Sequence, residues 1–344
     1  MPSSDHVVRA TGLTKRYREK LALDGVDLAV PRGTVHGLLG PNGAGKTTAV
    51  RILTTLTRLD DGEATVAGHD VRTAPRQVRR AIGLTGQQTA VDDLLTARQN
   101  LTMFGRLFRL DKVSARLRAD ELLELFALSD AADRVPKRFS GGMRRRLDVA
   151  ASMILAPQVL FLDEPTTGLD PAGRREVWQA VRELAERGTT VLLTTHYLDE
   201  ADQLCDRISV IHDGRNFVED TPAGLKRRIG DERLEVVVPD HDDLDAIAGI
   251  VARAAGTEPA VDRGGGMLSV PVPDGVHALT DVAAELRARG LDVADIGLRR
   301  PTLDEAFLQL TGGQPRPTTP PADATPVVAS PTETPTVDVK EPSR

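Results

Sequence analysis

The sequence predicts an α/β fold in which a parallel sheet supports a phosphate-binding loop and a helical segment separates two groups of strands. Three observations indicate this class. Residues 34–39 read as a short buried strand before the glycine-rich stretch at residues 40–47, and a helical pattern follows. Residues 159–162 are a continuous apolar run, and residues 190–194 are three apolar residues between two threonines; both patterns are typical of parallel strands buried on both faces. Between these parts, residues 88 to about 157 have helical periodicity.

Composition excludes several classes of protein. The 344 residues are enough for two or three domains of about 150 residues each. Hydrophobic residues make up 40% of the chain but aromatics only 3%, so a large core would consist mostly of Leu, Val, Ile and Ala. The net charge of −6 argues against a nucleic-acid-binding surface over the whole chain. Cys205 is the single cysteine, which excludes an intrachain disulfide, suits a reducing cytosol and predicts a small core residue.

The sequence contains no pattern for membrane insertion. No segment approaches the roughly 18 consecutive apolar residues that span a bilayer. The first six residues contain no apolar signal region. We therefore expect a soluble, intracellular chain that reaches a membrane only through a partner.

The first strands and the loop are indicated by local patterns. Val26, Leu28 and Val30 keep the period of two of a half-buried strand. Residues 40–47 fit the phosphate-loop pattern G-x-x-x-x-G-K-[ST], whose glycines let backbone N–H groups surround phosphate oxygens at a helix N-terminus. In such a loop the side chain of Lys46 reaches the β- and γ-phosphates. The hydroxyl of the next residue, Thr47, ligates Mg²⁺.

The helical segment contains two apolar patterns. Thr96 and Gln99 fit a capping box before the apolar positions Leu101 and Phe104. A second pattern covers residues 117–128. Together they predict two helices in the first half of the segment.

A third helix of this segment is predicted to begin after Ser140, a candidate N-cap. Gly141 and Gly142 leave its first backbone N–H groups open, which makes this a second candidate phosphate contact. The arginines at residues 144–146 are expected to lie on a solvated helix face.

Two acidic residues, Asp163 and Glu164, follow the apolar run at residues 159–162. At the end of a parallel strand beside a phosphate loop, Asp163 can hold Mg²⁺ through water. Glu164 can orient or deprotonate the attacking water. A surface acidic pair is the alternative interpretation. Because kinases, GTPases and many ATPases share a phosphate loop, the remaining motifs must decide among these classes.

A break near residues 230–231 separates a C-terminal region with its own pattern. Its order of strand, helix, two strands, helix and strand is that of a ferredoxin-like unit, and a further helix follows. Beyond residue 312 the chain is rich in Pro, Thr and Ala, which predicts a disordered tail. The predicted strands are residues 234–238, 259–262, 267–272 and 291–298, and the predicted helices are residues 242–255, 276–289 and 302–311.

Together these motifs resemble the nucleotide-binding subunit of ATP-binding cassette (ABC) transporters, in order through residues 6–224. The resemblance implies a P-loop NTPase domain of the ABC type at residues 6–230, with its helical subdomain at about 88–157. Residues 231–312 then form an accessory α+β domain, and residues 313–344 the tail. Four motifs match in the first half: Tyr17 is the adenine-stacking aromatic, residues 40–48 are the Walker A loop, Gln87 is the Q-loop glutamine and residues 139–143 are the family signature. Three more follow: residues 160–164 are the Walker B strand, residues 168–170 are the D-loop and His196 is the switch histidine.

The resemblance implies ATP and Mg²⁺ as cofactors. It implies Glu164 as general base, His196 as a γ-phosphate contact, Lys46 for charge neutralisation and Gln87 as γ-phosphate sensor. The implied Mg²⁺ contacts are Thr47, Gln87 and Asp163. The implied nucleotide-binding residues are Tyr17, Gly40, Pro41, Asn42, Gly43, Ala44, Gly45, Lys46, Thr47, Thr48, Ser140, Gly141, Gly142 and Asp170.

Departures from the common ABC pattern sharpen the resemblance. Phe139 and Met143 replace the usual outer residues of the signature, and Gly86 stands where Pro is commoner. These variants, with residues 144–148 and the closing stretch at 300–307, are similar to the daunorubicin/doxorubicin-resistance ATP-binding subfamily of ABC-2 type multidrug exporters. That resemblance covers residues 6–312 and implies efflux of an anthracycline-like drug or antibiotic.

The resemblance also implies partners. Two copies close head to tail, so that residues 140–142 of one chain cap the ATP held by residues 40–48 of the other. Gln87 would link this homodimer to a separate transmembrane permease at the cytoplasmic face of the cell membrane, with no nucleic-acid partner. Asp170 has two expected roles, as a helix N-cap and as a dimer contact, and one residue can serve as both. Tyr17 and His196 have plainer alternatives, as a surface aromatic and as a structural histidine.

Two other function classes compete with transport. A non-transport ABC-type ATPase in translation or DNA maintenance would usually carry tandem cassettes or long coiled-coil insertions, and the sequence has neither. A small-molecule kinase offers no reason for the Ser140-Gly141-Gly142 stretch.

Overall fold

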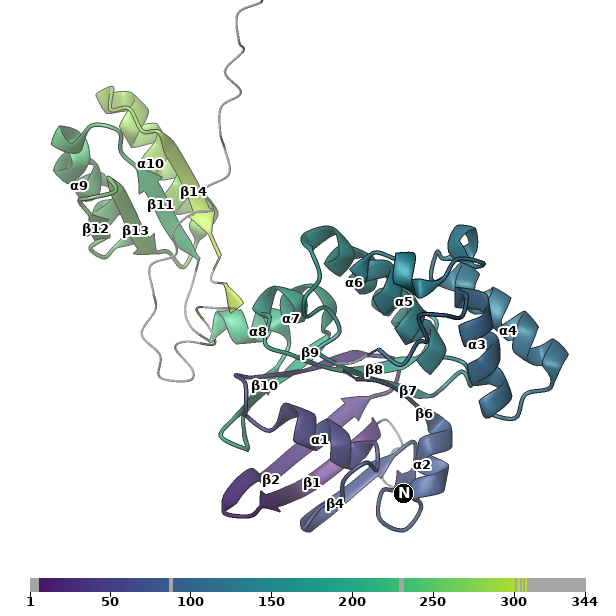
Figure 1. Ribbon diagram of the computed structural model, residues 1–344. Helices are drawn as coiled ribbons and strands as arrows, with labels where there is room; N and C mark the ends of the chain where they lie inside the picture. Colours follow the sequence, from purple (N-terminus) through teal and green to yellow (C-terminus); the bar gives the residue numbers. More distant parts are fainter. Residues whose placement is uncertain are drawn as a thin grey trace, which may run out of the picture.

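The computed structural model describes residues 6–86, 89–228 and 232–300, together with Thr302, Leu303, Glu305 and Phe307. Gln87, residues 229–231 and the tail at residues 313–344 lie outside the described residues. The expectations for Gln87 and for the tail therefore stay predictions. Figure 1 shows a larger part with two sheets and several helices, and a smaller unit with a sheet of its own.

A mainly parallel sheet lies at the centre of the larger part. Its strands follow the order β10 (Arg215–Asp220), β9 (Arg207–His212), β3 (Val35–Leu39), β8 (Thr190–Thr195), β7 (Val159–Asp163) and β6 (Ile82–Thr85). The strands from β9 to β6 run parallel, and β10 pairs antiparallel with β9. The predicted central strands are confirmed, because β7 and β8 have neighbours on both sides and all their residues are buried.

An antiparallel sheet packs against one face of the central sheet. Its order is β2 (Lys20–Pro31), β1 (His6–Tyr17), β4 (Asp61–Val66) and β5 (His69–Asp70). Val26, Leu28 and Val30 of β2 are buried in the same core as Phe161 of β7, which confirms their period of two. Helix α1 (Lys46–Leu53) belongs to this core through Val50, Ile52 and Leu53.

Helices cover the other face of the central sheet. Leu160 and Leu162 of β7 join the core formed there with Leu147, Val177 and Ala201 of α5 (Gly141–Ser152), α6 (Pro171–Glu186) and α7 (Leu198–Leu204). Successive residues of a strand point to opposite faces, so β7 supplies apolar side chains to both cores. This two-sided burial explains its continuous apolar sequence. Of two short helices in the larger part, α8 (Pro222–Arg227) joins this helix-covered core through Leu225, whereas α2 (Pro75–Ala81) joins the core of the antiparallel sheet through Val78.

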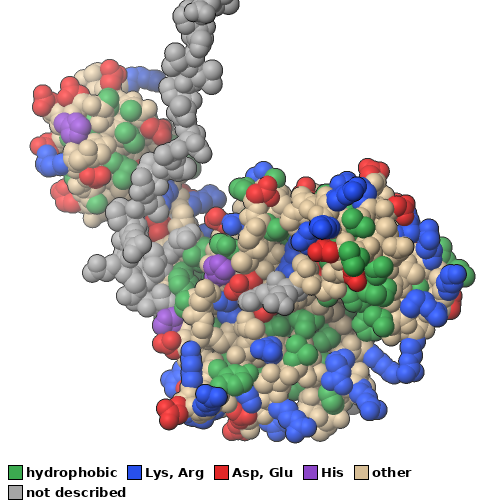
Figure 2. Space-filling view, in the orientation of Figure 1, with side chains coloured by type: hydrophobic (Ala, Val, Ile, Leu, Met, Phe, Trp, Pro, Cys, Tyr) green, Lys and Arg blue, Asp and Glu red, His purple; other side chains and the backbone are tan. Residues whose placement is uncertain are grey.

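The predicted helices of the inserted segment are present as α3 (Ala97–Leu107) and α4 (Lys112–Leu125), with 3₁₀ turns at Ser129–Ala131 and Pro136–Arg138. The capping box is confirmed, because Thr96 Oγ1 accepts the Gln99 N–H at 3.2 Å and Gln99 Oε1 accepts the Thr96 N–H at 2.8 Å. The apolar residues of these two helices are only partly buried in the core, since Leu107 is 68% exposed and Leu117 is 59% exposed. Figure 2 shows hydrophobic side chains gathered among Lys and Arg side chains over this part of the molecule.

The C-terminal region forms a third, antiparallel sheet. Its order is β12 (Ala260–Asp262), β13 (Met267–Pro271), β11 (Arg233–Val237) and β14 (Asp295–Arg299). The helices α9 (Leu244–Ala255) and α10 (Gly275–Arg289) each connect strands that are not neighbours, which is the split βαβ arrangement of a ferredoxin-like unit. A 3₁₀ turn, His241–Asp243, precedes α9. Strand β14 begins later than predicted because Gly290 ends α10 with a φ of 66° and Leu291 donates to the Leu286 carbonyl.

The chain returns to the larger part after β14. Leu303 is only 3% exposed and lies in the helix-covered core of the central sheet, and Phe307 packs against the same core. Of the helices in the described part of the chain, none combines the length and apolar character that crossing a membrane requires.

Candidate functional site

The phosphate loop lies between the buried strand β3 and the first turn of α1. Gly43 and Gly45 have φ values of 84° and 111°, in the region that side chains rarely adopt. A Cβ on Gly45 would lie 2.6 Å from the Ala22 carbonyl oxygen, and one on Gly40 would lie 2.2 Å from that of Ile211. The loop therefore needs glycine both for its backbone conformation and for its close approach to neighbouring strands.

Lys46 begins α1 and is only 4% exposed. Its Nζ donates to the carbonyl oxygens of Gly40 at 2.7 Å and Pro41 at 3.1 Å. Burial lowers the pKa of Lys46, and the charges of Glu164 and Asp163 act in the opposite direction. The ammonium group is thus held inside the curve of the loop, with two carboxylates in its surroundings.

A hydroxyl and a carboxylate meet below the loop. Thr47 Oγ1 donates to Asp163 Oδ1 at 3.2 Å, and Thr194 Oγ1 of β8 donates to the same oxygen at 2.6 Å. Hydroxyl and carboxylate oxygens fit a hard divalent cation such as Mg²⁺. Within the described ranges no three His, Cys, Asp or Glu side chains gather to hold a metal. Thr47 and Asp163 therefore fit a Mg²⁺ ion that is completed by phosphate oxygens and water.

Glu164 follows β7 with an unusual backbone. Its φ of 50° is left-handed, and its N–H donates to both the carbonyl and the hydroxyl oxygen of Thr194 at 3.1 and 3.0 Å. Its carboxylate lies between two side chains, with Oε1 3.3 Å from His196 Nδ1 and Oε2 accepting from Thr167 Oγ1 at 3.4 Å. These contacts aim the carboxylate toward the phosphate loop.

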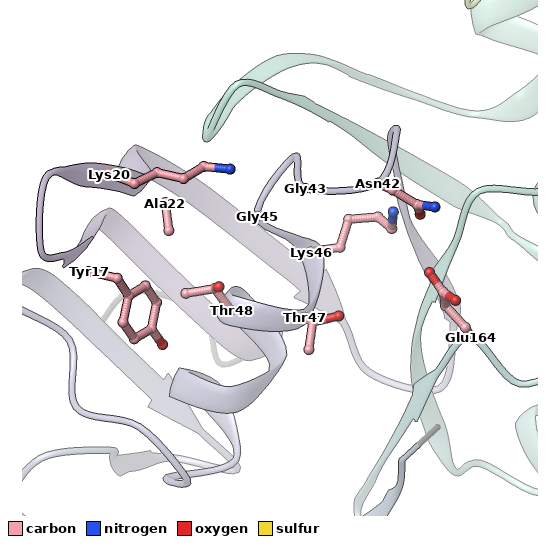
Figure 3. A pocket seen from close by; sticks show the side chains of 10 residues that line it. All are labelled: Tyr17, Lys20, Ala22, Asn42, Gly43, Gly45, Lys46, Thr47, Thr48 and Glu164. Carbon is pink, nitrogen blue, oxygen red and sulfur yellow. The ribbon is translucent and has the colours of Figure 1, made fainter. Parts of the chain in front are cut away.

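A cleft of about 550 Å³ joins these groups, a size that suits a nucleotide. Figure 3 shows Lys46 extending toward Glu164, with Tyr17 on the opposite side of the loop. Tyr17 is 44% exposed, as a stacking platform must be. The site predicted from sequence missed two of the lining residues, Lys20 and Ala22, because only the β1–β2 turn brings them near the loop. The cleft is lined by Tyr17, Lys20, Ala22, Asn42, Gly43, Gly45, Lys46, Thr47, Thr48 and Glu164.

The predicted second phosphate contact lies at a separate place. Ser140 caps α5 by accepting the Met143 N–H at 3.2 Å, and Gly141 lines a smaller cavity of about 200 Å³. A Cβ on Gly142 would lie 3.0 Å from Gly173 Cα, so this glycine also permits close packing of α5 on α6. Asp170 is the N-cap of α6 and accepts the Gly173 N–H at 2.9 Å. Within one chain, the described lining of the nucleotide cleft includes neither Ser140 nor the two glycines after it.

The prediction for the three arginines at residues 144–146 is wrong for two of them. Arg145 is 6% exposed, and the Arg146 side chain is 11% exposed, with Nη2 3.1 Å from Glu176 Oε2. Only Arg144 is half-exposed, and it donates to the Pro136 carbonyl at 3.1 Å. Successive helix residues are about 100° apart, so three in a row cannot share one solvated face. That geometry was the available signal in the sequence.

Sequence reasoning also missed Thr194 and Thr167, which orient Asp163 and Glu164. Thr194 lies at the end of a predicted buried strand, and parallel strands end at the same edge of a sheet. That placement is the signal that could have found it. Thr167 has no comparable signal, because the turn after β7 brings its hydroxyl back to Glu164.

Comparison with known proteins identifies the family. Residues 23–167 match the family model described as ABC transporter. The chain is 63% identical over 307 residues to daunorubicin resistance ATP-binding protein DrrA2 of Streptomyces coeruleorubidus, covering 89% of this chain and 95% of that protein. It is 49% identical to daunorubicin/doxorubicin resistance ATP-binding protein DrrA of Streptomyces peucetius, over 89% of this chain and 92% of that protein.

A solved structure supports the same fold. It is an ATP-binding cassette described as dimeric, in a post-hydrolysis state and bound to ADP and Pi. The TM-score is 0.56 at 28% identity, over 62% of this chain and 98% of that one. The phosphate loop and Glu164 line one cleft, His196 lies 3.3 Å from the Glu164 carboxylate, and the family match shows that the chain binds and hydrolyses ATP. It belongs to the daunorubicin/doxorubicin-resistance ATP-binding proteins of the ABC transporter family.

Proposed function

We propose that this chain powers efflux of an anthracycline-like drug or antibiotic through a separate membrane permease, from the cytoplasmic face of the cell membrane. The observation that carries the proposal is the 63% identity, over nearly the whole chain, to a daunorubicin resistance ATP-binding protein. The same relationship favours transport over a translation or DNA-maintenance role. Residues 6–230 would be the ATP-binding domain and residues 231–312 the accessory domain.

In this proposal Glu164 is the general base that takes a proton from the attacking water. Its carboxylate is 3.3 Å from His196 Nδ1, which supports a role for His196 beside the γ-phosphate. Lys46 would neutralise charge on the β- and γ-phosphates, and the backbone N–H groups of residues 40–48 would hold their oxygens. Tyr17 would stack on the adenine, a role favoured by its exposed position in the cleft.

A bound Mg²⁺ would offset phosphate charge. Thr47 and Asp163 would hold it, and their 3.2 Å hydrogen bond supports this pairing. Gln87 would be the third contact and would sense the γ-phosphate.

The complete site would require a second copy of the chain. Ser140, Gly141 and Gly142 of one protomer would cap the nucleotide held by its partner, with Asp170 at the dimer contact. Two observations support this arrangement. Gly141 is exposed at the start of α5 and lies outside its own chain's cleft, and a similar cassette is described as dimeric.

Transport in membrane vesicles tests the proposal. Inverted vesicles would contain this chain and the permease that copurifies with it, and ATP-dependent uptake of daunorubicin, doxorubicin and unrelated amphipathic compounds would be measured. We expect uptake of an anthracycline with the unaltered chain and none with Glu164→Gln. Copurification with ribosomes, or ATP hydrolysis without uptake of any compound in the panel, would contradict the export function.

A further inference from the structure

Arg145 occupies a buried position between three segments that meet at the hydrolytic end of the site. Its side chain is 7% exposed and extends from the second turn of α5. Its Nε donates to the Pro165 carbonyl at 2.8 Å, and Nη1 donates to the Gly86 carbonyl at 2.8 Å. Its Nη2 donates to the carbonyls of Asp163 at 3.3 Å and Glu164 at 3.5 Å.

The remaining acceptor is Asp148, one turn along α5, whose Oδ2 is 3.4 Å from Arg145 Nη1. The other oxygen of this carboxylate accepts the Ala90 N–H at 2.7 Å. With these contacts every N–H direction of the guanidinium has an acceptor. Burial lowers the pKa of Arg145 and raises that of Asp148, while each charge partly offsets the effect on the other. A guanidinium nevertheless stays charged in proteins.

The acceptors explain what this arginine can do. Asp163, Glu164 and Pro165 form the turn in which Glu164 has the left-handed φ of 50°, a conformation that costs about 1 kcal/mol or more for a non-glycine residue. The Glu164 N–H is held by Thr194 on one side, and the carbonyls of the turn are held by Arg145 on the other. Because hydrogen bonds fix both the N–H and the carbonyl groups of this turn, the backbone of Glu164 is fixed and its carboxylate keeps one direction.

The same side chain connects two further segments. Gly86 and Ala90 flank the segment that contains Gln87. Arg145 donates to the Gly86 carbonyl before this segment, and Asp148 accepts the Ala90 N–H after it. Arg145 also belongs to the helix that Ser140 caps. The direction of Glu164 is therefore tied to the position of α5.

We propose that Arg145 is a positioning residue for ATP hydrolysis, which holds the turn after β7 so that Glu164 points at the phosphate loop and which couples this turn to α5. This inference rests on the proposed role of Glu164 as general base. Arg145 acts through backbone carbonyls and does not line the nucleotide cleft of its own chain. Its removal should therefore lower kcat while ATP binding persists.

Arg145→Lys tests the proposal, because lysine keeps the charge beside Asp148 but cannot span the four carbonyls. We expect kcat of the full-length chain with Mg·ATP to fall about 10- to 100-fold, with KM for ATP changing less than about threefold. The matched control is Arg118→Lys. Arg118 also donates to two backbone carbonyls, those of Met153 and Ile154, but lies away from the site, and its variant should keep the full kcat.

A double-mutant cycle separates a positioning role from a general structural one. If Arg145 acts through Glu164, Arg145→Lys should lower the residual rate of Glu164→Gln by less than about twofold. An equal fractional loss in both backgrounds, or a kcat for Arg145→Lys within about twofold of the unaltered chain, would overturn the inference. Near-normal hydrolysis by Glu164→Gln alone would instead refute the general-base role itself.

Folding is checked by the melting temperature and circular dichroism of each variant. If Arg145→Lys does not fold, Asp148→Asn takes its place, because it retains the side-chain shape and weakens the hold on Nη1. This variant should lower kcat about threefold or more with ATP affinity retained. An unchanged kcat for Asp148→Asn would count against the proposal.

Discussion

At the scale of single residues, Glu164 combines a left-handed backbone with side-chain partners on both carboxylate oxygens. Replacing it by Gln keeps the shape but removes the proton acceptor. We expect Glu164→Gln to bind ATP with near-normal affinity in calorimetry and to hydrolyse it at least about 100-fold more slowly. Glu63→Gln, an exposed position on β4, is the control and should hydrolyse at the normal rate. Near-normal turnover by Glu164→Gln would refute the general-base role.

His36 is a second informative residue, buried in β3 just before the phosphate loop. Its Nε2 is 2.8 Å from Ser209 Oγ, which donates to Glu219 at 3.1 Å, and Arg207 in turn donates to Glu219. No hydrogen-bond partner for His36 Nδ1 occurs in the described part of the chain. Burial lowers the pKa of His36 to about 4, and the charge of Glu219 only partly opposes this. The folded protein therefore holds a neutral imidazole at neutral pH.

This lowered pKa makes stability depend on pH. The unfolded chain takes up a proton near pH 6.5, while the folded chain does so only near pH 4. His36 therefore removes stability as the pH falls from about 6.5 to about 4, by roughly 3 kcal/mol in total. We expect His36→Gln to reduce this slope in urea unfolding measured across that range. His6→Gln, at an exposed position on β1, should keep the slope, and identical slopes for His36→Gln and the unaltered chain would contradict the assignment.

At the scale of elements, α3 provides a clean test of helix capping. The Thr96 side chain accepts a backbone N–H of the first turn in the capping box. Thr102 lies inside the helix, and its hydroxyl donates to the Arg98 carbonyl at 2.8 Å. We expect Thr96→Ala to lower the free energy of unfolding by about 1 kcal/mol, measured by denaturant titration. The same substitution at Thr102 should cost less than about 0.5 kcal/mol, because alanine is a better residue for helix interiors. If Thr96→Ala and Thr102→Ala lowered the free energy of unfolding equally, the capping box would not be the source of the Thr96 effect.

The wrongly predicted arginines belong to this scale too. A run of three charged residues suggests a solvated surface, but α5 is packed on both sides, against α6 and against the turn after β7. Arg145 and Arg146 therefore donate to backbone carbonyls, and Arg146 also pairs with the Glu176 carboxylate, where the prediction had placed water. Which of the three is buried depends on how the helix is oriented, and the residue types alone do not determine that.

At the scale of the whole molecule, the C-terminal region is attached to the ATP-binding part through Leu303, which shares a core with Leu225. We hypothesise that residues 231–312 stabilise the dimer. In the Glu164→Gln background, where ATP persists, a chain ending at Arg228 should have an ATP-dependent dimer dissociation constant several-fold higher than the full-length chain. Light scattering over a concentration series measures this, and circular dichroism checks that the shortened chain folds. An unchanged dimer would refute the hypothesis.

Much of the fold could be predicted because its signals are local. The buried strands β3, β7 and β8, the capping box of α3 and the glycines of the phosphate loop each follow from a few consecutive residues. The late start of β14 could not be predicted as easily, since three of the four residues before it (Leu291, Val293 and Ala294) are apolar and only the end of α10 draws Leu291 into a helix-capping bond. Local composition identifies elements better than it identifies their ends.

The sequence by itself determined that this chain has a phosphate loop, an acidic strand end and a candidate switch histidine, because each is a short pattern with its own chemistry. The tertiary structure alone decided that Glu164 lies between His196 and Thr167, that Thr194 orients both acidic residues, and that Arg145 is buried beneath them. These residues are far apart in the chain. They meet because parallel strands end at one edge of a sheet and because α5 packs against that edge, and such contacts depend on the assembly of the whole domain.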